Sequence, residues 1–266
     1  MTGRGFDATA AAYEGFLGRW SRLWATALVA ATRLTPGARV LEVAAGSGQA
    51  THAAATAAGP SGRVIATDLS VEMLRVAHAA PPAAPSAPVA FAAMDGRSLA
   101  VRDETVDAVV CLLGLMFFPD PLAGLAEFRR VLRPGGRAAL AVWAEPERAP
   151  FPGIMVEVLA RHLPFVKREL EVAFALADEA QLETLLRDSG FEDVAVGRES
   201  RAVKFESFDD FWEPIEAGSR AGAALRDLPE PARLALQDDL RARMAAYETQ
   251  GWLVMDCETL LATGRR

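Results

Sequence analysis

The stretch Val40-Leu41-Glu42-Val43-Ala44-Ala45-Gly46-Ser47-Gly48-Gln49-Ala50-Thr51 decides the fold of this chain of 266 residues. It reads as an apolar strand that contains an acid, then a turn with two glycines, then the start of an alanine-rich helix. A second strand over Val64–Thr67 leads to Asp68. Glycines let the backbone approach a ligand closely, and an acid after the second strand is suited to accept hydrogen bonds from ribose hydroxyls. This order predicts a cofactor that carries a nucleoside.

Strands and helices continue to alternate as far as residue 143. The apolar run Val106–Leu113 is typical of a central parallel strand that is covered on both faces. Asp120 is suited to cap a helix whose first residue is Pro121, and Arg137–Trp143 is the next strand. The alternation predicts a parallel, doubly wound sheet.

The C-terminal part departs from this alternation. Asp178 is expected to cap a helix that ends at Ser189, and strands are expected at 194–205 and 252–262. Segments 144–177 and 206–250 hold many aromatic residues, and we expect them to cap the carboxyl ends of the strands, where ligands bind in open α/β sheets. The prediction is an α/β, Rossmann-like, mostly parallel sheet of seven strands with helical cap segments. Its expected parts are an N-terminal helical lid (1–33), a cofactor-binding core (34–145) and a C-terminal part that completes the sheet and caps the substrate (146–266).

The composition of the chain argues against several classes of binding partner. The net charge is -7 and no run of Lys and Arg occurs, which argues against binding to a nucleic-acid backbone or to an anionic membrane. No signal-peptide pattern and no apolar stretch of membrane-spanning length is present, so we expect a cytoplasmic protein. Cys111 and Cys257 are expected to be buried small hydrophobes, and no Cys and His cluster predicts a metal site. We expect a small-molecule substrate; the oligomeric state stays open, a homodimer included.

Two cofactor classes fit the glycine turn. A dinucleotide fold requires G-x-G-x-x-G, and here Thr51 stands in place of the third glycine after Gly46 and Gly48. S-adenosylmethionine has no pyrophosphate, and Glu42 at the end of the first strand is suited to hold its ammonium group. Asp95, after the third strand, is suited to accept a hydrogen bond from the adenine amino group. These residues favour S-adenosylmethionine and leave a nicotinamide-dependent oxidoreductase as the weaker alternative.

With these residues the chain resembles the class I S-adenosylmethionine-dependent methyltransferases, in particular the small-molecule group related to the ubiquinone and menaquinone C-methyltransferases. The resemblance covers about residues 6–145 well and the rest loosely. The matching segments are Leu41–Gly48, Asp68–Leu74, Met94-Asp95, Gly114–Asp120, Arg130–Arg137 and the N-terminal Tyr13–Arg22. The family often has a glycine where this chain has Ala44. We expect Ala44 to keep a negative φ and the cofactor still to bind.

The resemblance implies a set of cofactor-binding residues. Asp68 would bind the ribose hydroxyls, Leu69 would cover the adenine, and Tyr13 would close over the cofactor. The full expected set is Tyr13, Glu42, Ala44, Gly46, Gly48, Asp68, Leu69, Met73, Met94, Asp95, Gly96, Leu112 and Leu113. Leu112 and Leu113 are also simply explained as core residues.

Methyl transfer from a sulfonium requires mainly that the nucleophile be positioned and water excluded. A base is required only where the acceptor must first lose a proton. His162 is the preferred catalytic candidate because it falls in the expected cap, although a lone histidine is more often structural or solvated. Aromatic residues around the mouth predict an apolar or aromatic acceptor for oxygen, carbon or nitrogen methylation. The expected pocket residues are Phe16, Trp20, Phe117, Phe118, Trp143 and Trp212. A methyltransferase fold that uses the cofactor as a scaffold for another reaction remains an alternative.

Overall fold

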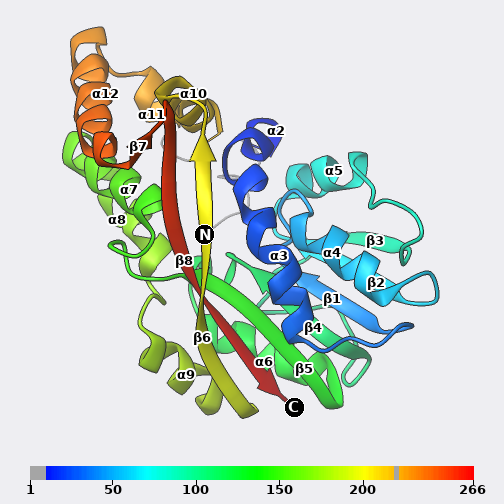
Figure 1. The fold of residues 1–266 in the computed structure, drawn as a ribbon. Helices are drawn as coiled ribbons and strands as arrows, with labels where there is room; N and C mark the ends of the chain where they lie inside the picture. The colour runs from blue at the N-terminus through cyan, green and yellow to red at the C-terminus, as the bar shows by residue number, and fades with distance from the viewer. Residues whose placement is uncertain (1–9, 219–221) are drawn as a thin grey trace.

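A computed structural model describes residues 10–218 and 222–266. Its centre is a single mixed sheet in the order β3-β2-β1-β4-β5-β8-β6, with the short strand β7 paired to β8 (Figure 1). Strands β1 to β5 run parallel, and β8 is antiparallel to both β5 and β6. The strands are β1 Arg39–Val43, β2 Arg63–Asp68, β3 Val89–Ala93, β4 Val106–Leu112, β5 Leu132–Trp143, β6 Glu192–Phe205, β7 Glu248–Thr249 and β8 Trp252–Arg265. The predicted α/β sheet of seven principal strands is confirmed.

Helices cover both faces of this sheet. Helices α3, α4 and α5 pack on one face, and α6 and α9 pack on the other. The described helices are α2 Ala10–Tyr13, α3 Arg19–Ala31, α4 Gln49–Ala58, α5 Val71–Ala79, α6 Pro121–Val131, α7 Pro150–His162, α8 Lys167–Glu171, α9 Glu179–Asp188, α10 Phe208–Gly218, α11 Gly222–Arg226 and α12 Glu230–Met244. A π-helical turn, η1 Glu14–Gly18, joins α2 to α3, and 3-10 turns lie at η2 Leu115–Phe117, η3 Pro164–Val166, η4 Val172–Phe174 and η5 Ala245–Tyr247.

Local sequence explains where several helices begin. Ser70 Oγ accepts a hydrogen bond from Met73 N at 3.1 Å, and Asp120 Oδ1 accepts one from Ala123 N at 3.0 Å. Asp178 caps α9 in the same way through Gln181 N at 2.7 Å. Each cap satisfies a backbone N–H that has no partner within its helix. The expected caps at Asp120 and Asp178 are therefore confirmed.

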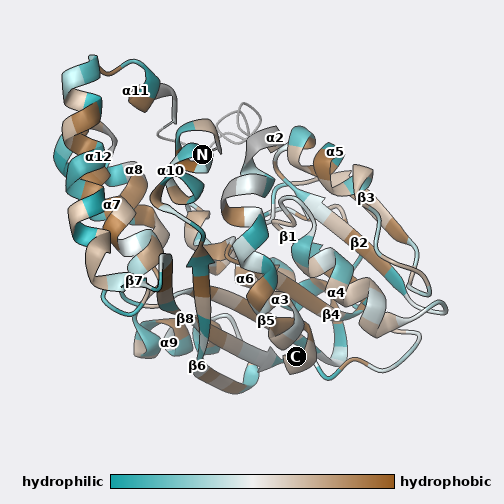
Figure 2. Ribbon diagram, turned by 45° about the horizontal axis from the view of Figure 1, so that its top comes forward, coloured by the Kyte–Doolittle hydropathy of each residue, from teal (hydrophilic) through white to brown (hydrophobic). Residues whose placement is uncertain are grey.

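Two strands extend well beyond the rest of the sheet. β6 and β8 have 14 residues each, whereas β1 has five. Their far halves project past the carboxyl end of the parallel strands, where α7, α10 and α12 gather around them (Figure 1). Hydrophobic residues fill the strands of the sheet, and hydrophilic residues are frequent along α12 (Figure 2). In the described part of the chain, no helix combines the length and apolar character needed to cross a membrane.

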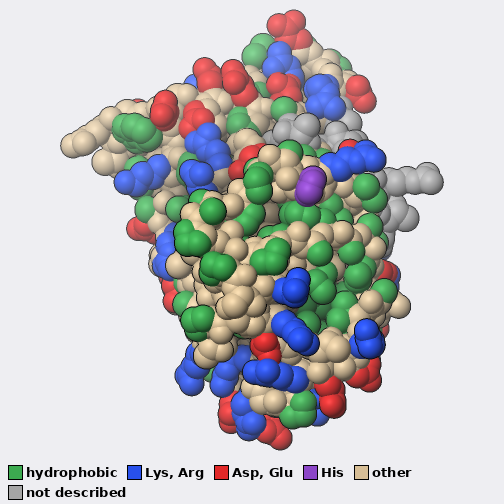
Figure 3. Space-filling view, turned by 90° about the vertical axis from the view of Figure 1, so that its right-hand side faces the viewer, with side chains coloured by type: hydrophobic (Ala, Val, Ile, Leu, Met, Phe, Trp, Pro, Cys, Tyr) green, Lys and Arg blue, Asp and Glu red, His purple; other side chains and the backbone are tan. Residues whose placement is uncertain are grey.

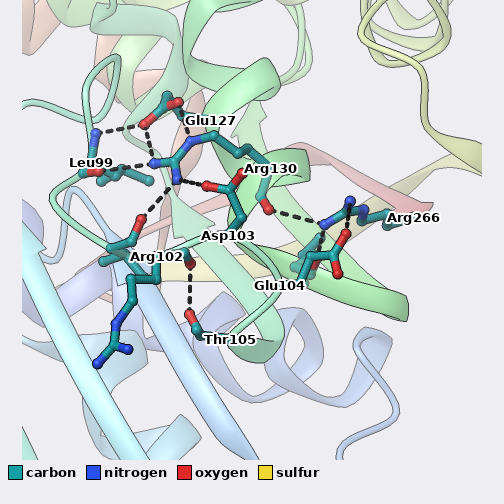
Figure 4. A network of polar contacts seen from close by, with 10 residues as sticks. Leu99, Arg102, Asp103, Glu104, Thr105, Glu127, Arg130 and Arg266 are labelled. Atoms are coloured by element: carbon teal, nitrogen blue, oxygen red, sulfur yellow. Dashed lines mark hydrogen bonds and ion pairs between the residues drawn. The ribbon is translucent and has the colours of Figure 1, made fainter.

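The connection from β3 to β4, two parallel strands that are not neighbours in the sheet, contains no helix; residues 94–105 form turns and irregular chain. Arg130 of α6 holds this segment from behind. Its guanidinium donates to Leu99 O at 2.9 Å and to Val101 O at 2.8 Å, and it also binds Glu127 and Asp103 (Figure 4). Leu99 N in turn donates to Glu127 Oε2 at 2.7 Å. One arginine thereby satisfies backbone carbonyls that a helix would have paired.

Candidate functional site

The glycine turn after β1 has a left-handed backbone at three positions. Ala44, Gly46 and Gly48 have φ angles of 59°, 54° and 92°. The prediction of a negative φ for Ala44 is wrong. An alanine in this region crowds its Cβ against the backbone, which costs about 1–2 kcal/mol. Leu113, at the end of β4, also has a positive φ of 53°, so two non-glycine residues are strained at the same end of the sheet.

Asp68 ties the end of β2 to this turn. Its Oδ2 accepts a hydrogen bond from Gly46 N, and its Oδ1 accepts one from Ser70 N, both at 2.8 Å. The carboxylate therefore fixes the turn and the start of α5 relative to each other. A carboxylate has about four lone-pair sites in all, so hydrogen bonds from backbone N–H groups and from ribose hydroxyls are compatible on one carboxylate.

A cavity opens above the turn, at the carboxyl ends of β1, β2 and β4. Its lining includes eleven of the thirteen residues expected to bind the cofactor: Tyr13, Ala44, Gly46, Asp68, Leu69, Met73, Met94, Asp95, Gly96, Leu112 and Leu113. The other lining residues are Val43, Arg97, Gly114, Phe117, Phe118 and Pro119. The lining suits S-adenosylmethionine, because carboxylates able to accept hydrogen bonds from hydroxyl and amino groups stand beside apolar walls. Gly46 also leaves room for a ligand, since the nearest atom to a Cβ built on it is Tyr13 Cε1 at 3.8 Å.

Glu42 is absent from the cavity lining. Its side chain is buried, and its carboxyl accepts a hydrogen bond from Thr51 Oγ1 of α4. Burial raises the pKa of Glu42 to about 8; the Thr51 hydrogen bond opposes the shift and the nearby charge of Asp68 adds to it. Glu42 is therefore mainly protonated at neutral pH. Thr51, which replaces the third glycine of a dinucleotide motif, serves as the partner of this acid.

Gly48 is the second expected residue that the cavity does not reach. It lies at the start of α4, and a Cβ built on it would be 3.0 Å from the Cβ of Ala77. In this structure the absence of a side chain at Gly48 allows the turn to pack against α5.

Tyr13 covers the cavity from the N-terminal side, over Gly46. Burial, together with the charges of Asp68 and Glu14, raises the pKa of Tyr13 far above its usual value, so its phenol stays protonated. The neighbouring Glu14 accepts two hydrogen bonds from Gln49 Nε2 of α4, at 2.9 and 3.0 Å. This contact fixes the N-terminal segment on the helix that follows the turn.

Asp95 and Arg97 form an ion pair on the cavity wall. Asp95 Oδ2 lies 2.7 Å from Arg97 Nη2. Hydrogen bonds from Arg97 hold the pKa of Asp95 below its usual range. Sequence reasoning did not single out Arg97, although a basic residue two positions after an expected base-binding acid was a signal for it.

The expected substrate aromatics divide into two groups. Phe117 and Phe118 line the cavity. Trp20, Trp143 and Trp212 are instead buried in the core, where their rings pack on Phe205, Trp24 and Phe208 with centroid distances of 4.6, 5.3 and 6.5 Å. The side chain of Phe16 lies outside the described residues.

The structure does not bring His162 to the cavity. Its Nε2 lies 3.2 Å from Asp239 Oδ2, so it joins the end of α7 to α12. Cys111 is buried and burial raises the pKa of its thiol to about 12, which leaves it un-ionised. Among the residues that the structure describes, no group of His, Cys, Asp and Glu could hold a metal ion.

The face of the molecule that carries β3 and α5 has hydrophobic and charged side chains in different regions. Hydrophobic side chains gather near its centre, and in the lower part of this face Asp and Glu side chains are interspersed among Lys and Arg (Figure 3). Three arginines, Arg39, Arg63 and Arg102, line a groove at the amino ends of β1 and β2 whose described lining shares only Met94 with the cavity.

Comparisons with known proteins agree with this geometry. A family model described as a methyltransferase domain matches residues 41–140. A demethylmenaquinone methyltransferase from Streptomyces griseus is 32% identical over 206 residues, with 71% of this chain and 86% of that protein covered. An uncharacterised protein from Mycobacterium bovis is 31% identical over 249 residues, with coverage of 90% and 85%.

A solved structure shows the same fold. The arsenic(III) S-adenosylmethionine methyltransferase from Chlamydomonas reinhardtii superposes with a TM-score of 0.51 at 21% identity, and the match covers 86% of this chain and 63% of that one. The glycine turn, the acids after β2 and β3 and the sequence relatives lead to one assignment. The chain belongs to the class I S-adenosylmethionine-dependent methyltransferases.

Proposed function

We propose that this methyltransferase transfers the methyl group of S-adenosylmethionine to a small, largely apolar aromatic or enolic acceptor that ionises without help from the protein. The observation that carries the proposal is the composition of the cavity wall. Beyond Leu113 the described lining residues are Gly114, Phe117, Phe118 and Pro119, all without a charged side chain. Such a wall favours an apolar ring over a charged acceptor.

The cofactor would bind across the turn. Asp68 would accept hydrogen bonds from the ribose, Asp95 would accept one from the adenine amino group, and Leu69 would cover the base. Leu112 and Leu113 would lie near the methionine portion. In the same proposal residues 1–33 would form a lid, 34–145 the cofactor-binding core, and 146–266 the part that completes the sheet and caps the substrate; residues 1–9 and 219–221 of these parts lie outside the described residues.

The titratable groups in the cavity wall indicate whether the protein supplies a general base. The described lining includes Tyr13, Asp68, Asp95 and Arg97, and it includes no His, Lys, Cys or Glu. Tyr13 keeps its proton, both oxygens of Asp68 already accept backbone hydrogen bonds, and Asp95 is paired with Arg97. None of these groups is poised as a general base. The acceptor would therefore lose its proton to water before it binds in the cavity.

Bound S-adenosylmethionine supplies a methyl group that is already activated on a sulfonium sulfur. The chain has two tasks in this proposal. Phe117 and Phe118 would hold the acceptor ring, and Tyr13 would exclude water from above the turn. Positioning and exclusion of water of this kind account for large rate enhancements without acid–base catalysis. The demethylmenaquinone methyltransferases among the relatives support a quinol-type ring as the first acceptor to test.

The test measures transfer of a labelled methyl group from S-adenosylmethionine to 1,4-naphthoquinol, to a series of substituted phenols and to an aliphatic amine. We expect label on an aromatic or enolic acceptor. The pH at half-maximal rate should follow the pKa of each acceptor across the series. The same midpoint for every acceptor would reveal a base on the protein. No transfer despite cofactor binding would favour the scaffold function.

Two variants control this assay. Asp68→Asn should abolish transfer because it weakens the contact to the ribose, whereas Asp188→Asn, on the exposed end of α9, should leave the rate unchanged. Loss of transfer in both variants would show that the assay reports general instability.

A further inference from the structure

The segment after β3 places Asp95 and Arg97 together on the cavity wall. Asp95 Oδ1 accepts hydrogen bonds from Arg97 N at 2.9 Å and from Arg97 Nε at 3.1 Å. Asp95 Oδ2 accepts one from Arg97 Nη2 at 2.7 Å. The planar guanidinium therefore holds the carboxylate by a two-pronged contact and fixes its orientation.

The two carboxylate oxygens differ in what they can still accept. Each oxygen has about two lone-pair sites. Oδ1 receives two donors and is filled, whereas Oδ2 receives one and retains an acceptor site. The side chains of Arg97 and Asp95 are 35% and 36% exposed, so packing alone does not immobilise the carboxylate. The contact with Arg97 is what keeps Oδ2 in place.

We propose that Arg97 is a positioning residue for base recognition, holding Asp95 Oδ2 where it accepts a hydrogen bond from a 6-amino group. This inference rests on the proposed placing of the adenine against Asp95. A purine with a 6-oxo group would place its carbonyl oxygen opposite Asp95 Oδ2, and these two hydrogen-bond acceptors repel each other. The pair thereby sets a preference for adenine over hypoxanthine in the cofactor.

Lysine at this position would not replace arginine. An ammonium group keeps the charge but cannot make the two parallel contacts that align a carboxylate. Loss of alignment, rather than loss of charge, is therefore the effect that distinguishes Arg97→Lys from a simple electrostatic change.

The experiment titrates S-adenosylhomocysteine and its deaminated analogue S-inosylhomocysteine into the full chain by calorimetry. In the wild type we expect the adenine form to bind about tenfold more tightly, the effect of one hydrogen bond to a charged acceptor. Arg97→Ala and Arg97→Lys should both reduce this ratio to about threefold or less. Arg102→Ala is the matched control, because Arg102 lies on the same segment, is exposed, and lines the groove rather than the cavity.

Asp95→Asn distinguishes a failure of the proposed adenine site from a failure of the proposed role of Arg97. An asparagine amide can turn its NH₂ group toward a 6-oxo group, so the ratio should fall to about one or invert. If Asp95→Asn keeps the wild-type ratio, the proposed placing of the adenine is wrong. If Asp95→Asn changes the ratio while both Arg97 variants keep it, only the role of Arg97 is overturned. An equal change in Arg102→Ala would also overturn it.

Discussion

A Cβ atom built on Gly114 would lie 2.4 Å from the Cβ atom of Ala44, so this backbone cannot carry a side chain at both positions. Ala44 belongs to the turn after β1, and Gly114 follows β4, the strand next to β1 in the sheet. The strained alanine of the turn is therefore accommodated by a glycine on the neighbouring strand connection. Both residues line the cavity, so their packing sets the shape of its floor.

The pair predicts a strong coupling between two substitutions. Ala44→Gly should stabilise the protein by about 0.5–1 kcal/mol, because relief of the left-handed strain exceeds the entropy that glycine loses on folding. Gly114→Ala should destabilise it by about 2 kcal/mol through overpacking. The double variant should recover about 1 kcal/mol or more of that loss. Urea unfolding measures all three, and Gly197→Ala, where a Cβ meets nothing within 4 Å, is the control. Additive effects would contradict the coupling.

Glu42 predicts a dependence of stability on pH. Its pKa is about 8 in the native state and 4.5 in the unfolded state, so the native state binds more protons between these values. The free energy of unfolding contributed by Glu42 therefore falls as the pH rises from 4.5 to about 8, and is constant outside this window. Glu42→Gln should remove this contribution while keeping an acceptor for Thr51. Urea unfolding at pH 5 and pH 8 tests it, with the partly exposed Glu72→Gln as control. An unchanged difference between the two pH values would refute the assignment.

We expect removal of the Arg130 side chain to disorder the segment between β3 and β4. Arg130→Ala should destabilise the protein by about 2 kcal/mol, because it leaves two backbone carbonyls and two carboxylates without their donor. Amide hydrogen exchange should rise most over residues 98–106. Cofactor binding should weaken several-fold, since the same segment carries Asp95. Arg75→Ala removes only an ion pair on the surface of α5 and should cost less than about 0.5 kcal/mol. Exchange that rises evenly over the whole chain would argue against local anchoring.

We expect substitution of His162 to leave catalysis almost unchanged. Its ring is occupied with Asp239 between α7 and α12, outside the described lining of the cavity. His162→Ala should therefore change kcat for methyl transfer by less than about twofold, because removal of a general base typically costs a hundredfold or more. The measurement compares kcat and thermal stability for His162→Ala and for Asp68→Asn. A tenfold loss of kcat with an unchanged melting temperature would restore His162 as a catalytic candidate.

The sequence predicted most of the fold because its signals were local. Apolar runs, glycines and the caps at Asp120 and Asp178 placed most strands and helices of the sheet within a few residues, although β5 begins at Leu132 and not at Arg137 and the cap helices α7, α8 and α10 were not placed. The same signals placed the acids after β2 and β3, and eleven of the thirteen expected residues line one cavity. Their contact with the cofactor remains a prediction.

The failures required information that is not local. The φ of Ala44 depends on Gly114, which lies on another strand connection. The carboxyl of Glu42 faces α4 instead of the cavity, and there it accepts a hydrogen bond from Thr51 Oγ1. His162 and Asp239 lie 77 residues apart, and the pattern of neither helix reveals that they meet. Aromatic content likewise could not separate pocket residues from core residues: Trp20, Trp143 and Trp212 were expected in the pocket and are buried in the core.

The antiparallel strand β8 has a consequence for synthesis of the chain on the ribosome. It lies between β5 and β6, both of which are translated before it, and among the described strands β6 pairs only with β8. Until β8 emerges, one edge of β5 and the whole of β6 lack their hydrogen-bonded neighbour. Unpaired edges of this kind recruit other chains. The nascent protein therefore passes through an interval in which its N-terminal half is complete and its sheet is still open to misassembly.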